Sequence, residues 1–96
     1  MKLIFLIYNV VIENKIMEEL EKAEVKAYTK LPSIHGVGTH SAPHLDNNVW
    51  PGVNHGLFIG VEDEKKEEIL KRMKELKSTY EKEGLKVFVL PLEEVL

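Results

Sequence analysis

Three short segments of this 96-residue chain are apolar at nearly every position, and they limit the folds that are open to it. They run from Leu3 to Tyr8, from Leu57 to Val61 and from Val87 to Leu90. All three are rich in bulky apolar residues and far shorter than the stretch of about 20 apolar residues that a membrane-spanning helix needs. Each segment therefore predicts a buried β-strand.

Two helical patterns separate these strands. The first follows Asn9, a good helix-capping residue, and its apolar positions are Ile12, Ile16, Leu20 and Ala23. The second is predicted to begin at the cap Asp63 and to end at Gly84, and its apolar positions are Ile69, Leu70, Met73, Leu76 and Tyr80. A further strand is expected over residues 25–35, where Pro32 indicates an irregular or edge position.

The resulting order is strand, helix, strand, strand, helix, strand. It predicts an α+β, ferredoxin-like βαββαβ fold, in which an antiparallel four-stranded sheet carries two helices on one face. No linker or internal repeat divides the chain, so residues 1–96 are expected to form a single domain.

The apolar strands also carry information about assembly. Two helices cover only one face of such a sheet, and the strands of a monomer would then alternate between apolar and polar residues. Strands that are apolar on both sides predict that a second copy of the chain covers the other face. The alternative is an unusually apolar exposed sheet, although large patches of this kind are rare on monomers.

The segment 36–54 between the second and third strands has neither helical nor strand periodicity. Connections longer than about 12–15 residues are usually either functional or disordered. This one holds Trp50, two prolines and two histidines, and His35 and His55 flank it, whereas disordered linkers are poor in aromatic residues. We therefore expect the functional element of the protein here, with Trp50 either packing against the loop or stacking on a planar ligand.

Composition excludes several classes of protein. The net charge of −3 argues against nucleic-acid binding, which needs clustered Lys and Arg. The absence of Cys removes disulfides and thiol catalysis. The abundance of Lys and Glu is compatible with a heat-adapted source. The N-terminal apolar segment lacks the features of a signal peptide, so a cytoplasmic protein is expected.

The candidate binding residues allow two readings each. Gly36 and Gly38 either let backbone N–H groups approach an anion or simply permit the turn that leaves the second strand. Lys86 is either a partner for an anion or an ordinary lysine near the end of a strand. His40 and His44 are either ligands of a divalent metal or loop residues that form hydrogen bonds. Ser41 beside His40 matches no nucleophile motif, so the chain is not expected to be an enzyme.

Two stretches in register with this order of elements carry a family resemblance. They are Gly36-Val37-Gly38 at the start of the long segment and residues 84–95, Gly-Leu-Lys-Val-Phe-Val-Leu-Pro-Leu-Glu-Glu-Val. Together they resemble the nitrogen regulatory P-II signalling superfamily over nearly the whole chain. There the long segment is called the T-loop and has a Gly-x-Gly at its base. A glycine-rich B-loop precedes a Lys-Ile-Phe-Val-x-Pro-Val-Glu stretch.

The resemblance implies a homotrimer that binds a small ligand between subunits and signals to a target, such as a membrane transporter or an enzyme, through the loop. The implied ligand residues are Gly36, Gly38, Thr39 and His40 of one chain with Gly84 and Lys86 of another. An adenine nucleotide or another small anion is the expected ligand.

This sequence also departs from the family pattern. Thr39 and His40 stand where the family has Arg and Gln, and Glu83-Gly84-Leu85-Lys86 shortens the B-loop. The sequence also stops before the family's C-terminal arginines. These departures predict weak triphosphate binding and favour a smaller or singly charged ligand. The alternative function is a divalent-cation-binding trimer, similar to the CutA-like proteins, that uses His40 and His44.

Overall fold

The computed structural model of the chain describes residues 1–36 and 53–96. Its elements are the strand β1 (Lys2–Asn9), the 3-10 turn η1 (Val10–Ile12), the helix α1 (Glu13–Lys22), the strands β2 (Thr29–Ile34) and β3 (Asn54–Val61), the helix α3 (Asp63–Thr79) and the strand β4 (Leu85–Pro91). The order of strands and helices predicted from the sequence is confirmed.

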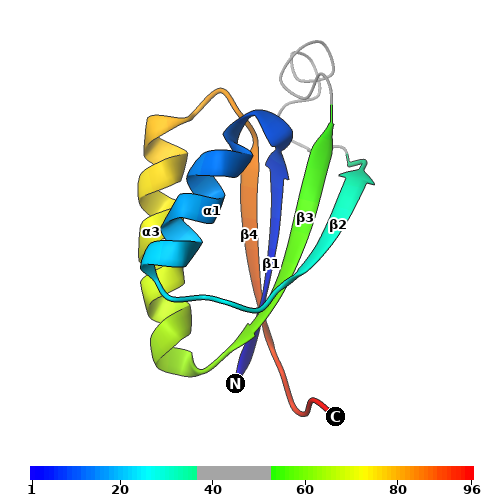
Figure 1. Ribbon diagram of the computed structural model, residues 1–96, viewed down its shortest axis with the longest axis vertical. Helices are drawn as coiled ribbons and strands as arrows, with labels where there is room; N and C mark the ends of the chain where they lie inside the picture. Colours follow the sequence, from blue (N-terminus) through cyan, green and yellow to red (C-terminus); the bar gives the residue numbers. More distant parts are fainter. Residues whose placement is uncertain (37–52) are drawn as a thin grey trace.

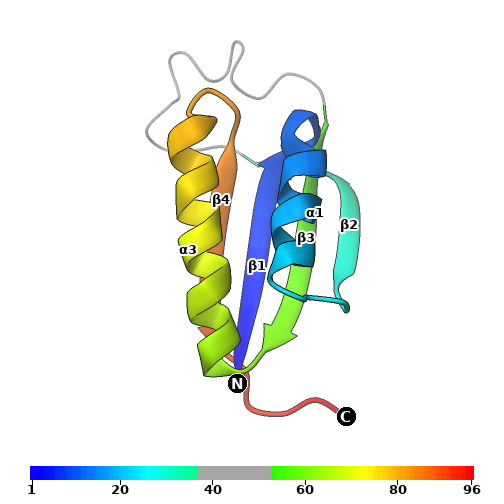
Figure 2. The ribbon, with the colours of Figure 1, turned by 60° about the vertical axis from the view of Figure 1, so that its left-hand side comes forward.

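The four strands form one antiparallel sheet in the order β2-β3-β1-β4. Strands β3 and β1 are central, and β2 and β4 form the two edges. Helices α1 and α3 lie side by side on the same face of this sheet (Figures 1 and 2). This is the predicted ferredoxin-like arrangement, and it gives the sheet a covered face under the helices and an open face on the other side.

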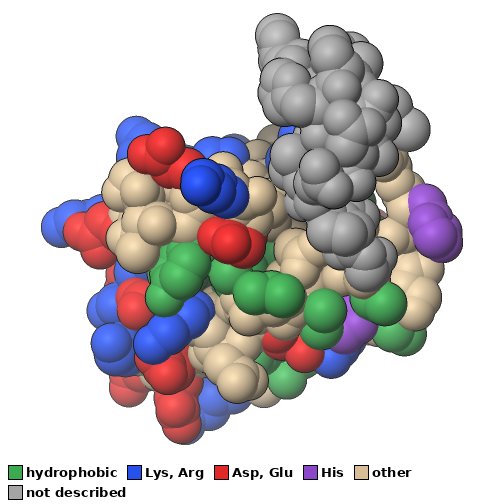
Figure 3. Space-filling view, turned by 90° about the horizontal axis from the view of Figure 1, so that it is seen from above, with side chains coloured by type: hydrophobic (Ala, Val, Ile, Leu, Met, Phe, Trp, Pro, Cys, Tyr) green, Lys and Arg blue, Asp and Glu red, His purple; other side chains and the backbone are tan. Residues whose placement is uncertain are grey.

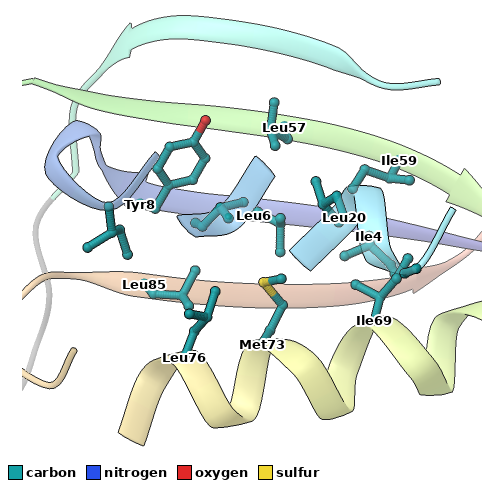
Figure 4. Close-up of a cluster of buried hydrophobic side chains, with 13 residues drawn as sticks. Ile4, Leu6, Tyr8, Leu20, Leu57, Ile59, Ile69, Met73, Leu76 and Leu85 are labelled. Carbon is teal, nitrogen blue, oxygen red and sulfur yellow. The ribbon is translucent and has the colours of Figure 1, made fainter. Parts of the chain in front are cut away.

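The hydrophobic core lies between the covered face and the two helices (Figure 4). Its buried members are Ile4, Leu6, Tyr8, Ile12, Ile16, Leu20, Ala23, Leu57, Ile59, Ile69, Met73, Leu76 and Leu85. On β1 every second residue belongs to this set, and on α3 the members recur at intervals of four and three residues. Burying one such large side chain contributes about 1.5–3 kcal/mol, so the strand and helix periodicities together specify this layer.

The open face is also apolar, as the sequence predicts. Phe5 on β1 lies in register with Phe58 on β3 and Phe88 on β4. The ring centroids of Phe5 and Phe58 are 4.5 Å apart, and those of Phe5 and Phe88 are 6.2 Å apart. Phe88 remains 46% exposed and Leu90 remains 43% exposed. No element of the described chain covers this aromatic row.

The start of the first helix differs in detail from the prediction. The side chain of Asn9 accepts a hydrogen bond from the backbone N–H of Val11 at 2.9 Å, so it caps the 3-10 turn η1 rather than α1 itself. Helix α1 begins at Glu13, whose carboxylate lies in the first turn, where the helix dipole favours negative charge.

The predicted ends of the second helix are wrong by a few residues. Glu62 is the N-cap residue of α3, and Asp63 is its first helical residue. The helix ends at Thr79, because the backbone of Tyr80 leaves the helical region. A turn follows, in which the backbone N–H of Glu83 donates to the carbonyl of Tyr80 at 3.3 Å. Gly84 therefore belongs to the approach to β4 and does not end the helix.

Strand β2 begins four residues later than predicted because the end of α1 uses the preceding residues. Val25 donates its backbone N–H to Leu20, and Glu24 donates to Glu21, which closes the helix in a Schellman motif. Glu24 occupies the left-handed position of this motif with a φ of 60°. Residues tied back to the helix in this way are not available to pair in the sheet.

Pro32 lies in the irregular part of an edge strand, as expected. Leu31 pairs with Gly56, and Ile34 pairs with Asn54, so three steps along β2 oppose two steps along β3. This is a β-bulge. Ser33 within it has a φ of 55°, in the left-handed region that favours glycine. The bulge lies immediately before the long connection between β2 and β3.

Candidate functional site

One end of the sheet gathers the ends of several connections. Here β1 and β2 finish, while β3 and β4 begin (Figure 1). The backbone N–H of Asn9 donates to the carbonyl of Gly84 at 3.0 Å, and that of Val10 donates to the carbonyl of Val53 at 2.9 Å. The approach to β4 and the return from the long connection are therefore both fixed to the end of β1.

Gly36 lies at this end of the sheet, just after β2, and is exposed. A Cβ atom built on it would meet nothing within 4 Å, and its φ lies outside the left-handed region. Neither a close neighbour nor the backbone conformation therefore requires glycine at this position in the described protomer. Both readings of Gly36, the anion-binding one and the turn, therefore stay predictions.

Lys86 lies at the same end of the sheet but on the opposite edge. It pairs with Ile7 on the open face of β4 and is exposed. Gly36 follows β2, and two strands separate β2 from β4. At roughly 4.8 Å per strand, about 14 Å separates the two edges. A single chain therefore does not bring Gly36 and Lys86 together, whereas the edges of two neighbouring copies would.

Four of the predicted ligand residues lie outside the described part of the chain. They are Gly38, Thr39, His40 and His44. Trp50 lies there as well, so its two readings stay open. Gly84 lies inside the described part, where its carbonyl accepts the hydrogen bond from Asn9.

The side chain of Asn54 adds a polar group to this end of the sheet. Asn54 is the first residue of β3, lies opposite Asn9 and is only 8% exposed. Its side-chain oxygen has no hydrogen-bond partner within the described residues. A buried acceptor of this kind costs about 1–3 kcal/mol when it is left unsatisfied. It is therefore well placed to receive a donor from outside the described protomer.

A second polar cluster lies on the covered side of the same end. One carboxylate oxygen of Glu13, Oε2, lies 2.6 Å from the hydroxyl of Tyr8, 2.8 Å from Nδ1 of His55 and 2.9 Å from Nζ of Lys30. These residues come from β1, β2, β3 and the start of α1. Glu13 thus links both strands that flank the long connection.

The cluster perturbs two pKa values. Burial alone would raise the pKa of Glu13, but the hydrogen bonds from Tyr8, His55 and Lys30 outweigh it and lower the pKa to about 2. Burial raises the pKa of the Tyr8 hydroxyl, and the hydrogen bond to the Glu13 carboxylate raises it further. Glu13 is therefore a fixed negative charge at neutral pH, and Tyr8 a fixed donor.

Sequence reasoning missed this cluster. It treated His55 only as a histidine flanking the loop and gave Glu13 no role. Their ring and carboxylate meet although 42 positions separate them in the sequence. The only local signal was an acidic residue in the first turn of a helix, which is common for reasons of the helix dipole alone.

The described residues offer no metal centre. Within them, no group of three or more His, Asp or Glu side chains is arranged to hold an ion. His55 is hydrogen-bonded to Glu13, and His35 follows the end of β2. None of the described helices is both long and apolar enough to cross a membrane.

The family model described as nitrogen regulatory protein P-II matches residues 1–96, and the chain belongs to this family. The resemblance seen in the sequence is thus confirmed. No curated protein matches the chain at a significant level.

Solved structures agree with this assignment. A PII-like signaling protein from Thermus thermophilus is 26% identical, with a TM-score of 0.66 over 93% of this chain and 83% of that one. CPII from Thiomonas intermedia, a nitrogen regulatory PII-like protein, is 17% identical in its apo form, with a TM-score of 0.67 over 93% and 87%. Its complex with ADP and bicarbonate aligns with 22% identity and a TM-score of 0.69 over 93% and 82%.

Proposed function

We propose that this chain is a non-enzymatic, homotrimeric P-II-like regulator. It binds a small anionic ligand between subunits, at the base of the 36–54 segment, and signals the occupancy of that site through this segment. The observation that carries the proposal is the position of Gly36 and Lys86 at the same end of the sheet but on opposite edges. Such a site is complete only when a second copy supplies the other edge.

The family supports both halves of this proposal. P-II proteins are regulatory, and the CPII structures contain ADP, AMP and bicarbonate, which are all small anions. In this chain, Lys86 supplies a positive charge, Gly36 offers accessible backbone, and the side-chain oxygen of Asn54 has no hydrogen-bond partner within the described residues. With Thr39 and His40 in place of Arg and Gln, a ligand with few charges fits better than a triphosphate.

The apolar open face supports the assembly. In the row of Phe5, Phe58 and Phe88, Phe88 is 46% exposed in one protomer and the other two rings are partly buried, and a second and third copy would bury the row. The target that reads the 36–54 segment is then a separate protein, for which a membrane transporter or a regulated enzyme is the expected class.

Isothermal titration with bicarbonate, AMP, ADP and ATP tests the ligand. Lys86→Ala should weaken binding by about 10- to 150-fold, because a charge-assisted contact contributes roughly 1.5–3 kcal/mol. Lys82→Ala, which removes an exposed lysine before β4, is the matched control and should leave affinity unchanged. Equal affinity in wild type and Lys86→Ala would move the site elsewhere.

The same titration with Zn²⁺ and Cu²⁺ addresses the metal alternative. Tight metal binding that is lost in His40→Ala/His44→Ala, together with no response to any of the four anions, would replace the proposed function by metal binding. Anion binding that is unchanged in this double variant would exclude the two histidines from the site.

A further inference from the structure

Two grooves flank the helical layer, one near each edge of the sheet. The first lies between α1 and the segment that leads into β2, and we call it the acidic groove. Its charged residues are Glu18, Glu21, Glu24 and Lys26, and its apolar residues include Met17 and Val25. Three carboxylates against one ammonium give this groove a net negative charge.

The second groove runs between α3 and the edge strand β4, and we call it the basic groove. Its charged residues are Lys71, Lys74, Lys77 and Glu67, and its apolar residues are Leu70, Met73 and Val87. The balance of charge is opposite to that of the acidic groove. Charged side chains gather densely on the side of the molecule where α3 lies (Figure 3).

The charges in the middle of the helical layer are paired within the chain. Arg72 on α3 lies 3.0 Å from Glu19 on α1 and 3.2 Å from Glu68 on its own helix. This network joins the two helices. The hydrogen bond from Arg72 is the main cause that lowers the pKa of Glu19. Desolvation raises the pKa of Glu68, but the hydrogen bonds from Arg72 and Lys65 outweigh it and lower that pKa as well.

The charges in the two grooves differ from this central network. Glu21, Glu24, Lys71 and Lys74 form no ion pair within the described residues. Glu18 lies 3.9 Å from Lys15 in an exposed pair, and Lys77 donates to the carbonyl of Leu85. Within residues 1–36 and 53–96, negative charge near one edge of the sheet and positive charge near the other are therefore left without ion-pair partners.

We infer that, in the assembly, the residues lining the acidic groove of one copy contact the residues lining the basic groove of the next copy. The two surfaces are different, so the contact is heterologous, and repeating it around a closed ring satisfies every copy. Charge complementarity selects the orientation and speeds the encounter, while the apolar residues of both grooves supply buried area. The occupant of each groove is thus another copy of this chain.

This pairing also has a consequence for the ligand site. It places the β2 edge of one copy beside the β4 edge of the next, which is the juxtaposition that Gly36 and Lys86 need. The inference rests on the proposed assembly and adds the residues that determine its direction. A trimer held only by the apolar open faces would show no dependence on these charges.

Charge reversal provides the test. Lys71→Glu/Lys74→Glu makes both grooves acidic, and Glu21→Lys/Glu24→Lys makes both grooves basic. Each variant should keep the circular dichroism spectrum of the fold but raise the dissociation constant of the assembly at least about tenfold, measured by sedimentation at low salt. Lys82→Glu reverses an exposed lysine that lines neither groove, and it should assemble like wild type.

Combining the variants sharpens the result. A chain that carries both pairs of reversals has restored complementarity and should form the same assembly as wild type. An equimolar mixture of the two singly reversed chains should form mixed dimers but no trimers, because alternating partners cannot close a ring of three. Failure of the combined chain to recover assembly would overturn the inference.

The outcomes separate this inference from the proposed function. If wild type is a trimer that binds an anion and both singly reversed chains remain equally good trimers, the groove pairing is wrong while the proposed function stands. If wild type is a monomer at micromolar concentration, the proposed trimeric regulator is wrong as well.

Discussion

The two faces of the sheet are built from the same strands with similar apolar residues, yet their environments differ. Ile4, Leu6 and Tyr8 of β1 are 0% exposed on the covered face. On the open face, Phe88 and Leu90 of β4 keep nearly half of their surface exposed. Among the described elements, the two helices make this difference, because they cover one face and leave the other open. One face therefore provides the core of a protomer, and the other retains apolar surface that is available for contact between protomers.

The largest effect is expected on the covered face. Leu57→Ala removes a fully buried side chain from β3 and should lower the free energy of unfolding by about 2–5 kcal/mol, because the cavity only partly collapses. Urea denaturation at a fixed protein concentration measures it. A loss below about 1 kcal/mol would mean that the covered face is not the tightly packed layer described above.

The Glu13 cluster at the polar end of the covered face should make the stability of the protein depend on pH in the acidic range. The pKa of Glu13 is about 2 in the folded protein, below its ordinary value of 4.5. The folded state therefore binds this proton less well than the unfolded chain does. The stabilisation is fully present above about pH 4.5 and is lost as pH falls towards 2, with an upper size of about 3 kcal/mol.

Glu13→Gln isolates this contribution. The variant should be less stable than wild type at neutral pH, and the difference should shrink between pH 4.5 and 2. Urea denaturation across that range measures it, and subtracting the two curves removes the contributions of the other carboxylates. A difference that stays constant with pH would show that the carboxylate charge is not what holds the cluster together.

The smallest effect on the protomer is expected on the open face. Phe88→Ala leaves the buried core intact, so the far-ultraviolet spectrum should not change. It should nevertheless weaken the assembly by about 1–2 kcal/mol per copy, a factor of about 5–30, because exposed ring surface would be buried there. Sedimentation equilibrium checks this expectation. If Phe88→Ala destabilised the protomer as strongly as Leu57→Ala does, the two faces would not differ in the way described above.

The layers of the fold could be predicted because strand and helix periodicities are local properties of the sequence. The element ends were harder, because they depend on backbone contacts that a pattern does not reveal. Val25 looked like part of a strand, but its N–H is used to close α1. Gly84 looked like a helix end, but the chain had already left the helix at Tyr80.

The candidate site also has a part that the sequence could indicate and a part that it could not. Gly36, Gly84 and Lys86 were found through a family resemblance, and the structure locates them at one end of the sheet without joining them in one chain. Gly38, Thr39, His40 and His44 remain predictions. The Glu13 cluster could not be predicted, because its four residues meet only after three strands and a helix have been placed.

The β-bulge in β2 shifts the phase of the strand by one residue. In a regular strand, residues three positions apart point to opposite faces, but Leu31 and Ile34 share the open face because the bulge absorbs one position. Removing one residue at Pro32 or Ser33 would therefore leave Ile34 paired with Asn54 in regular register, whereas a deletion elsewhere in the strand would turn its remainder over. Just before its longest connection, the chain thus has a place where its length can change by one residue without inverting the side chains that follow.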